Sequence, residues 1–288
     1  SADIKTQLLA GSLVRTPLSG IVAGDFVKTP YTPTEYFGAI ALSGTLIGVR
    51  ANTDDTTANI NLTKTKIEDA SGLTFVDIKA VKFNSDYNLI VVDDNRIHKL
   101  DLDPALTSNR AISGIGQFLI NTIGGKSRDI YDKDKFNTPV DIALGNNDEI
   151  YILDQLDYGI KRYDKDLNWI QTTARKNEYT SLSGGKVVSL DVDPVTNYVY
   201  VLSDNGIIME YTGDFEYKNK YVLEDPVSTT EKYKQIRFSE KDDTVVYIMT
   251  TDNLYKKFKT RLTRSIGVFR LTDNNITASE ALSFCSVM

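Results

Sequence analysis

The chain has 288 residues, of which 41% are hydrophobic and 25% are charged, and its formal net charge is -6 at pH 7. This composition is ordinary for a folded globular protein and excludes disordered and collagen-like chains. The acidic balance disfavours a protein that coats nucleic acid, because that function needs a dominant cationic face. Cys285 is the only cysteine, so an intrachain disulfide is excluded and packing alone must stabilise the fold.

Targeting and membrane signals are not recognisable in this sequence. The first residues lack a basic region followed by an apolar core, so a secretory signal is not expected. The longest mainly apolar segment, 38–49, is too short for a bilayer, which needs ~20 residues. We therefore expect no membrane segment, and the compartment stays unknown.

Four stretches of the chain share one pattern: an apolar strand, a polar turn with Asp or Asn, and a second strand that opens on an aliphatic residue. The stretches begin at Leu89, Ile150, Val199 and Val245. A shorter apolar strand precedes each of them, and a fourth strand can follow, as at 168–172 and 220–223. One such unit cannot bury both faces and must stack on a neighbour. Four antiparallel strands in each repeat predict the blades of a β-propeller.

A weaker unit precedes these four, so the predicted repeats are 36–72, 75–106, 137–173, 186–224 and 233–271. Counted from Leu46, Leu89, Ile150, Val199 and Val246, their second strands are spaced by 43, 61, 49 and 47 residues, and the longest spacing predicts an insertion loop at 107–136. Segments 1–35 and 272–288 are expected to close the ring, because an unpaired terminal blade would expose a sheet face and edge.

The predicted fold is therefore an all-β, single-domain propeller over residues 1–288, with five or six blades of four antiparallel strands. A β-sandwich and an open β-solenoid are the alternatives, and the long repeat period disfavours both.

One repeat carries a recognisable order of residues. A Gly pair at 124–125 leads to Phe136 and Pro139, then to an apolar strand, to the strand 150–154 and to a strand that ends in Tyr163-Asp164. This order resembles an NHL repeat, and residues 94–101 resemble its second half. The resemblance extends over about residues 75–260. It implies a propeller, and NHL-like propellers mostly serve as binding platforms, with some RNA-binding members and a few enzymatic relatives.

Acidic and amide residues recur in the turn between the second and third strands, and in a propeller these turns share one rim. The candidate rim residues are Asp93, Asp94, Asn95, Asp154, Asp157, Asp204, Asn205, Asp252 and Asn253. Together they could attract a cation or a basic partner. The favoured alternative is that tight turns select these residue types for backbone reasons.

A basic patch stands out from the acidic background. It consists of Lys256, Lys257, Lys259, Arg261 and Arg264. The patch could bind an acidic partner, but such runs are more often the solvated end of a hairpin, whose charges discourage edge pairing.

Few residues of this sequence are candidates for a catalytic role. His98 is the only histidine, and strand alternation predicts that it lies on the exposed face, in the same position as Lys161 in the next repeat. The predicted channel positions are Ala80, Asp141, Ser189 and Gln235, and one acid does not make a metal site. We therefore predict no catalytic residue, metal or cofactor.

The preferred function is a non-catalytic scaffold that binds through its rim and the 107–136 loop. The expected partner is a protein or an assembly neighbour, with a glycan as a second possibility, and the composition would suit a subunit of a phage virion or tail. The first alternative is a metal-dependent, lactonase-like hydrolase that uses Asp141. The second is an RNA-binding propeller that stacks bases on Tyr158, Trp169 or Tyr179, which the acidic rim opposes.

Overall fold

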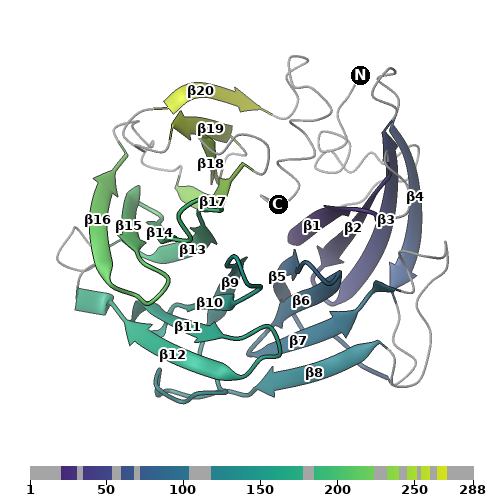
Figure 1. Cartoon of the computed structure of the whole chain (residues 1–288), viewed down its shortest axis with the longest axis horizontal. Coiled ribbons are helices and arrows are strands. Elements are labelled where there is room, and N and C mark those ends of the chain that lie inside the picture. Colours follow the sequence, from purple (N-terminus) through teal and green to yellow (C-terminus); the bar gives the residue numbers. More distant parts are fainter. Residues whose placement is uncertain are drawn as a thin grey trace. The chain divides into compact units, whose positions relative to one another are not determined.

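The structure is a computed structural model that describes residues 21–30, 35–53, 60–67, 72–103, 118–177, 185–223, 232–239, 245–251, 254–259 and 265–270. In this part of the chain, each run of four consecutive strands forms one antiparallel sheet in which every strand pairs with the next (Figure 1). The predicted blade, a four-stranded antiparallel meander, is confirmed.

The first two sheets come from the amino-terminal part of the chain. One sheet contains β1 (Ala23–Lys28), β2 (Glu35–Leu42), β3 (Thr45–Thr53) and β4 (Ile60–Ile67). The other contains β5 (Ile78–Phe83), β6 (Asn88–Asp93), β7 (Arg96–Asp101) and β8 (Leu119–Gly124).

Three more sheets follow in the same order. They consist of β9 (Pro139–Leu144), β10 (Ile150–Asp154), β11 (Gly159–Tyr163) and β12 (Trp169–Ala174); of β13 (Val187–Val192), β14 (Val199–Ser203), β15 (Ile207–Tyr211) and β16 (Tyr217–Val222); and of β17 (Tyr233–Phe238), β18 (Val245–Thr250), β19 (Leu254–Lys259) and β20 (Ser265–Arg270). A single turn of 3-10 helix, η1 (Leu156–Tyr158), connects β10 to β11.

The described residues belong to two compact units, the first ending at Ile123 and the second spanning Gly124–Arg270. Within the first unit β1 packs against β5, and within the second β13 packs between β9 and β17. Successive sheets that meet through their first strands are the blades of a β-propeller. A closed ring of five or six blades and a single domain over 1–288 are not confirmed, and residues 1–20 and 272–288, expected to help close the ring, lie outside the described part.

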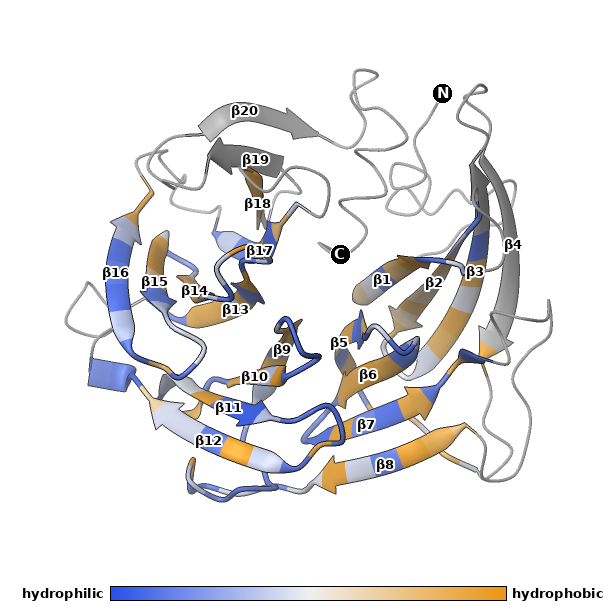
Figure 2. Ribbon diagram, in the orientation of Figure 1, coloured by the Kyte–Doolittle hydropathy of each residue, from blue (hydrophilic) through white to orange (hydrophobic). Residues whose placement is uncertain are grey.

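The core lies between neighbouring sheets of each unit. Strands β10 and β14 are buried along their whole length, and β18 is as well. The outer strand β16 is mostly exposed and polar, as Figure 2 shows. A blade is covered on both faces by its neighbours, so its middle strands read as continuous apolar runs rather than as alternating ones.

Two predicted boundaries are corrected. Residues 23–28, assigned to a ring-closing segment, form the first strand of the first sheet and pair with β2. Residues 119–124, assigned to the 107–136 loop, form β8, so that repeat extends to Gly124 instead of ending at 106. Because β8 is an exposed outer strand, it lacks the apolar run that marks the inner strands. Residues 107–117 lie outside the described part.

Candidate functional site

Asp141, the one acid among the predicted channel positions, forms a buried ion pair with Arg237. The Arg237 guanidinium donates from Nη1 to Asp141 Oδ2 at 2.9 Å and from Nη2 to Oδ1 at 2.8 Å. The Ser189 hydroxyl donates to Asp141 Oδ2 at 2.5 Å. Asp141 and Arg237 are only 2% and 3% exposed. This carboxylate is therefore neutralised and out of reach of a substrate, which argues against the lactonase-like site.

A metal site elsewhere in the described part of the chain also lacks the ligands it would need. Within the residues that the structure describes, no three His, Cys, Asp or Glu side chains are grouped so that they could hold a metal ion.

Two of the candidate rim acids are buried and bind backbone N–H groups. Asp93 Oδ1 accepts hydrogen bonds from the N–H groups of Val76, at 2.8 Å, and Asp77, at 2.7 Å. Both donors belong to the segment that enters β5, so the carboxylate connects the end of β6 to the start of the neighbouring strand β5.

The next blade repeats this arrangement. Asp154 accepts from the N–H groups of Asn137, at 2.8 Å, and Thr138, at 3.0 Å, which precede β9. In the blade after that, Asp204 accepts from the N–H of Lys186 at 2.9 Å. At these three turns the acid therefore accepts backbone hydrogen bonds from the segment that enters the first strand of its blade, and the carboxylates of Asp93 and Asp154 are buried rather than exposed on a rim.

The remaining predicted residues are distributed as follows. Asp94 is exposed with a left-handed φ of 51°, and the Asn205 side chain accepts a hydrogen bond from Ser203 Oγ at 2.5 Å. Asn95 is half-buried. Asp252, Asn253, Arg261 and Arg264 lie outside the described residues, as do the side chains of Lys256, Lys257 and Lys259 on β19.

His98 is buried, so its predicted position on an exposed face is wrong. It is 1% exposed, with Nδ1 at 2.8 Å from Thr122 Oγ1 and Nε2 at 3.3 Å from Asp93 Oδ2. Burial raises the pKa of the Asp93 carboxyl, but hydrogen bonds from His98 and from the N–H groups of Asp77 and Val76 outweigh it, and the net pKa is lowered. The histidine is a buried hydrogen-bonding partner of a structural carboxylate.

Lys161 occupies the corresponding position in the next blade and is also buried. It lies opposite Ile152 on β10, as His98 lies opposite Val91 on β6. Its ammonium donates to the carbonyl oxygens of Asp132 and Lys135, and it lies 5.0 Å from the centroid of the Phe136 ring. Burial lowers the pKa of Lys161, and the charges of Asp154 and Asp132 oppose this shift.

These contacts fix residues 127–136, called the anchored loop below, on the third sheet. Tyr163 donates its hydroxyl to the carbonyl of Lys133 at 2.5 Å, and Asn137 Nδ2 donates to the carbonyl of Ser127 at 3.2 Å. Ile130 packs so closely on Gly159 that a Cβ added there would lie 2.4 Å from Ile130 Cδ1. Residues 127–136 of the predicted 107–136 insertion are therefore held against the third sheet by specific contacts.

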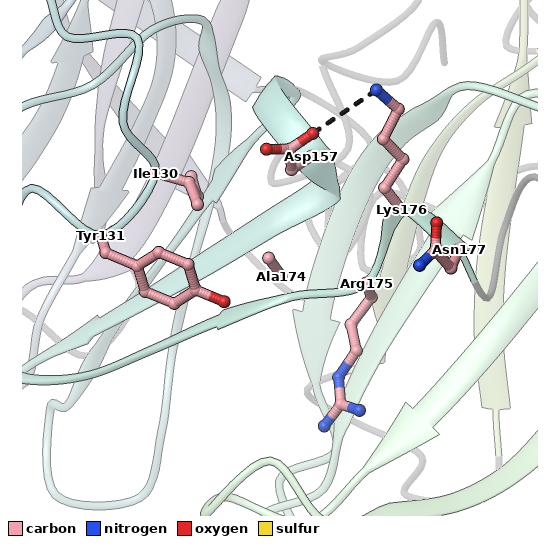
Figure 3. A pocket seen from close by; sticks show the side chains of 7 residues that line it. All are labelled: Ile130, Tyr131, Asp157, Ala174, Arg175, Lys176 and Asn177. Atoms are coloured by element: carbon pink, nitrogen blue, oxygen red, sulfur yellow. Dashed lines mark ion pairs between the residues drawn. The ribbon is translucent and has the colours of Figure 1, made fainter.

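An open pocket of about 420 Å³ lies beside the anchored loop (Figure 3). Ile130 and Tyr131 line it from the loop, Asp157 lines it from η1, and residues 174–177 line it from the end of β12 and beyond. Tyr131 is 62% exposed. Asp157 Oδ1 and Lys176 Nζ are 3.5 Å apart, and these two side chains are 42% and 59% exposed.

The backbone around Asp157 is held in an uncommon conformation. Asp157 and Tyr158 have φ values of 50° and 51°, in the left-handed region that side chains other than Asn and Asp rarely adopt. The N–H of Arg175 donates to the Asp157 carbonyl at 3.0 Å and ties this turn to the end of β12. Such conformations persist only where surrounding contacts enforce them.

Arg175 is directed away from the ion pair, as Figure 3 shows. Its Nη2 donates to the carbonyl of Phe215 at 2.7 Å, and its guanidinium lies 5.1 Å from the centroid of the Tyr211 ring. Arg175 therefore supports the wall of the pocket and the neighbouring blade.

The sequence predicted this site in part. Asp157 was a candidate rim residue, and residues 130 and 131 belong to the predicted 107–136 segment, but their proximity to each other was not foreseen. Tyr131, Lys176 and Asn177 were missed as individual residues. No periodic signal marks them, because they lie in connections whose path depends on the anchoring contacts of Lys161 and Gly159.

Comparison of the sequence with known protein families gave no matching family, and comparison with curated proteins gave no matching relative. Among the described residues, no helix has the length and apolar character that a membrane span requires.

Proposed function

We propose that this chain is a non-catalytic β-propeller binding module whose partner contacts the pocket beside the anchored loop. One observation carries the proposal: the fold brings an exposed aromatic side chain and an exposed ion pair together on a rigid scaffold. Loops that a scaffold positions are where binding residues concentrate. The resemblance of residues 123–164 to an NHL repeat supports it, because such propellers mostly serve as binding platforms.

The competing functions have less support. A hydrolase that uses Asp141 would need a carboxylate that reaches substrate or metal, and this one is buried against Arg237. An RNA-binding surface would need aromatic side chains beside unpaired cations, whereas Lys176 in the pocket faces Asp157. A role as a structural subunit of an assembly such as a phage virion or tail remains a hypothesis from composition.

The test must leave the scaffold intact. Deletion of 107–136 would remove β8 and the carbonyl partners of Lys161, so a loss of binding by that variant would not locate the site. A photo-crosslinking residue at position 131 probes the pocket directly. Position 218 on the exposed strand β16 of the same unit is the matched control.

We expect crosslinking of the full chain in an extract of its natural source to yield a defined partner from position 131 but not from 218. The yield should fall when Asp157→Asn and Lys176→Ala are added, and Asn keeps the left-handed backbone at position 157 unstrained. Equal products from both positions, or products that the two substitutions leave unchanged, would place the binding surface elsewhere.

A further inference from the structure

We infer that the pocket beside the anchored loop takes an uncharged saccharide. The inference rests on the proposed function and specifies its ligand. It follows from three properties of the lining: the ion pair, the exposed aromatic ring, and the fixed backbone that carries Tyr131 and Asp157.

The described lining holds one acid and two bases, and each of these three side chains is already engaged by another group. Asp157 and Lys176 face each other at 3.5 Å, and the guanidinium of Arg175 is engaged with the Phe215 carbonyl and the Tyr211 ring. An anion would have to displace Asp157 from Lys176, and a cation would have to displace Lys176 from Asp157. Either exchange gives up one ion pair to form another, so it brings little net energy at a site open to solvent.

The same ion pair suits neighbouring hydroxyl groups. A carboxylate offers acceptors only and an ammonium offers donors only, whereas a hydroxyl both donates and accepts. Two adjacent hydroxyls of a sugar can therefore bind Asp157 and Lys176 at once without breaking the pair. Hydrogen bonds to charged groups are also stronger than those between neutral groups. Asn177, whose amide both donates and accepts, completes the polar side of the lining.

Tyr131 supplies the apolar side. Its ring is 62% exposed and lies across the pocket from Asn177, with Ala174 between them (Figure 3). A sugar ring has one face of C–H groups and an edge of hydroxyls, so it can stack on the tyrosine while its edge reaches the ion pair. Tyrosine combines a large apolar area with a polar tip, which suits this contact. The volume of about 420 Å³ falls within the usual range for small-molecule sites.

The backbone that carries Tyr131 and Asp157 is positioned in advance. Lys161 and Tyr163 fix the loop that carries Tyr131, and the hydrogen bond from Arg175 to the Asp157 carbonyl fixes the turn. Preorganised groups lose little conformational entropy when a ligand binds, which weakly binding uncharged ligands require.

Other ligand classes fit less well. A phosphate group needs converging cations or N–H donors that are not already committed, and the two cations here are engaged by Asp157, Phe215 and Tyr211. A divalent cation needs several oxygen ligands, and among the described residues of the lining Asp157 is the only carboxylate.

The experiment is saturation-transfer NMR on the full chain with glucose, galactose, mannose and N-acetylglucosamine, and with short oligosaccharides of each. Inorganic phosphate and glucose 6-phosphate are the charged probes. We expect at least one neutral sugar to bind with a Kd of ~1 mM or tighter. Its affinity should be the same within about twofold at low and high NaCl, because no net charge is recognised.

Two variants locate the binding. Tyr131→Ala and Asp157→Asn should each weaken it by about tenfold, roughly 1.4 kcal/mol. Asn tolerates the left-handed backbone at position 157, so the second variant removes charge and acceptor strength without strain. Val195→Ala is the matched control, because Val195 is a 61% exposed apolar residue of the same unit, in the turn between β13 and β14, and should leave binding unchanged.

Three results would overturn the inference: no neutral sugar binds, only the phosphorylated probes bind, or the sugar binds Tyr131→Ala as well as the unsubstituted chain. If a partner still crosslinks at position 131 in the first two cases, the binding module stands and its ligand is of another class. If nothing crosslinks there either, the proposed function fails with it.

Discussion

The buried pair of Asp141 and Arg237 offers a sharp test of how the second unit is held together. The change is Arg237→Met, which keeps an unbranched side chain but removes the guanidinium. That group donates to both oxygens of Asp141, to Ser189 Oγ, and to the carbonyls of Leu190 and Ile236. In the variant the carboxylate stays buried, with the Ser189 hydroxyl and the N–H groups of Leu190 and Ile142 as its donors.

Leaving one charge of a buried pair without its partner costs about 3 to 5 kcal/mol. The double variant Asp141→Leu, Arg237→Met removes both charges and should recover most of that loss, because the desolvation of two ions disappears with them. Urea unfolding followed by the fluorescence of Trp169 measures the effect, since the single tryptophan lies in the same unit. At an m-value of about 2.5 kcal/mol/M, the single variant should shift the midpoint by roughly 1 to 2 M.

Two results would contradict this account of the cluster. A loss below about 1 kcal/mol in Arg237→Met would mean that the carboxylate finds water or another partner, and is less sealed than its burial indicates. A double variant as unstable as the single one would show that shape and hydrogen bonding, rather than unpaired charge, set the cost.

Three further changes address the carboxylate turns and the anchored loop. The pKa of Asp93 in the folded state is lowered, so the stability that its carboxylate contributes is present above about pH 4 and is lost as the pH falls through that folded-state pKa. The variant Asp93→Asn should therefore be less stable than the unsubstituted chain at pH 7 and approach its stability in acid. Urea unfolding followed by circular dichroism at several pH values measures this difference. Lys161→Met should raise amide hydrogen exchange in the anchored loop by about tenfold or more while the sheets stay protected, and unchanged exchange would refute the anchoring. Gly159→Ala should displace Ile130 and destabilise the second unit by about 1 kcal/mol, whereas Tyr131→Ala should stay within about 0.5 kcal/mol; equal thermal shifts in both would count against the close packing.

The inner strands of the blades could be predicted from sequence because their burial leaves a strong signal. The apolar runs that begin at Leu89, Ile150, Val199 and Val245 are all second strands of four-stranded sheets. Burial on both faces favours runs of apolar side chains, and short runs of this kind between polar turns are distinctive. The outer strand β8 has no such requirement, and it was assigned to a loop.

The polar residues could not be placed for a related reason. Alternation indicates an exposed face only where one face of a strand meets water, and in a blade both faces meet neighbours. His98 and Lys161 were therefore assigned to solvent although both are buried. Their presence in the core depends on partners distant in sequence, Thr122 for the first and the carbonyl of Asp132 for the second, which no local pattern encodes.

The turn carboxylates belong to a wider use of aspartate in this fold. The same contact joins neighbouring blades: Asp25 Oδ2 accepts from the N–H of Phe83 at 2.8 Å in the first unit, and Asp191 Oδ2 accepts from the N–H of Phe238 at 2.8 Å in the second. A carboxylate that accepts N–H groups pins a backbone more strongly than a neutral acceptor.

At these five positions the aspartates form hydrogen bonds that hold strands and blades together. Net charge is then a poor guide to a partner, because buried and engaged carboxylates project little field toward a ligand. The better guide is a side chain that folding does not require. Tyr131 meets this criterion, because its side chain is exposed although the loop that carries it is held in place by Lys161 and Tyr163. The pocket that Tyr131 lines is therefore where function should be tested first.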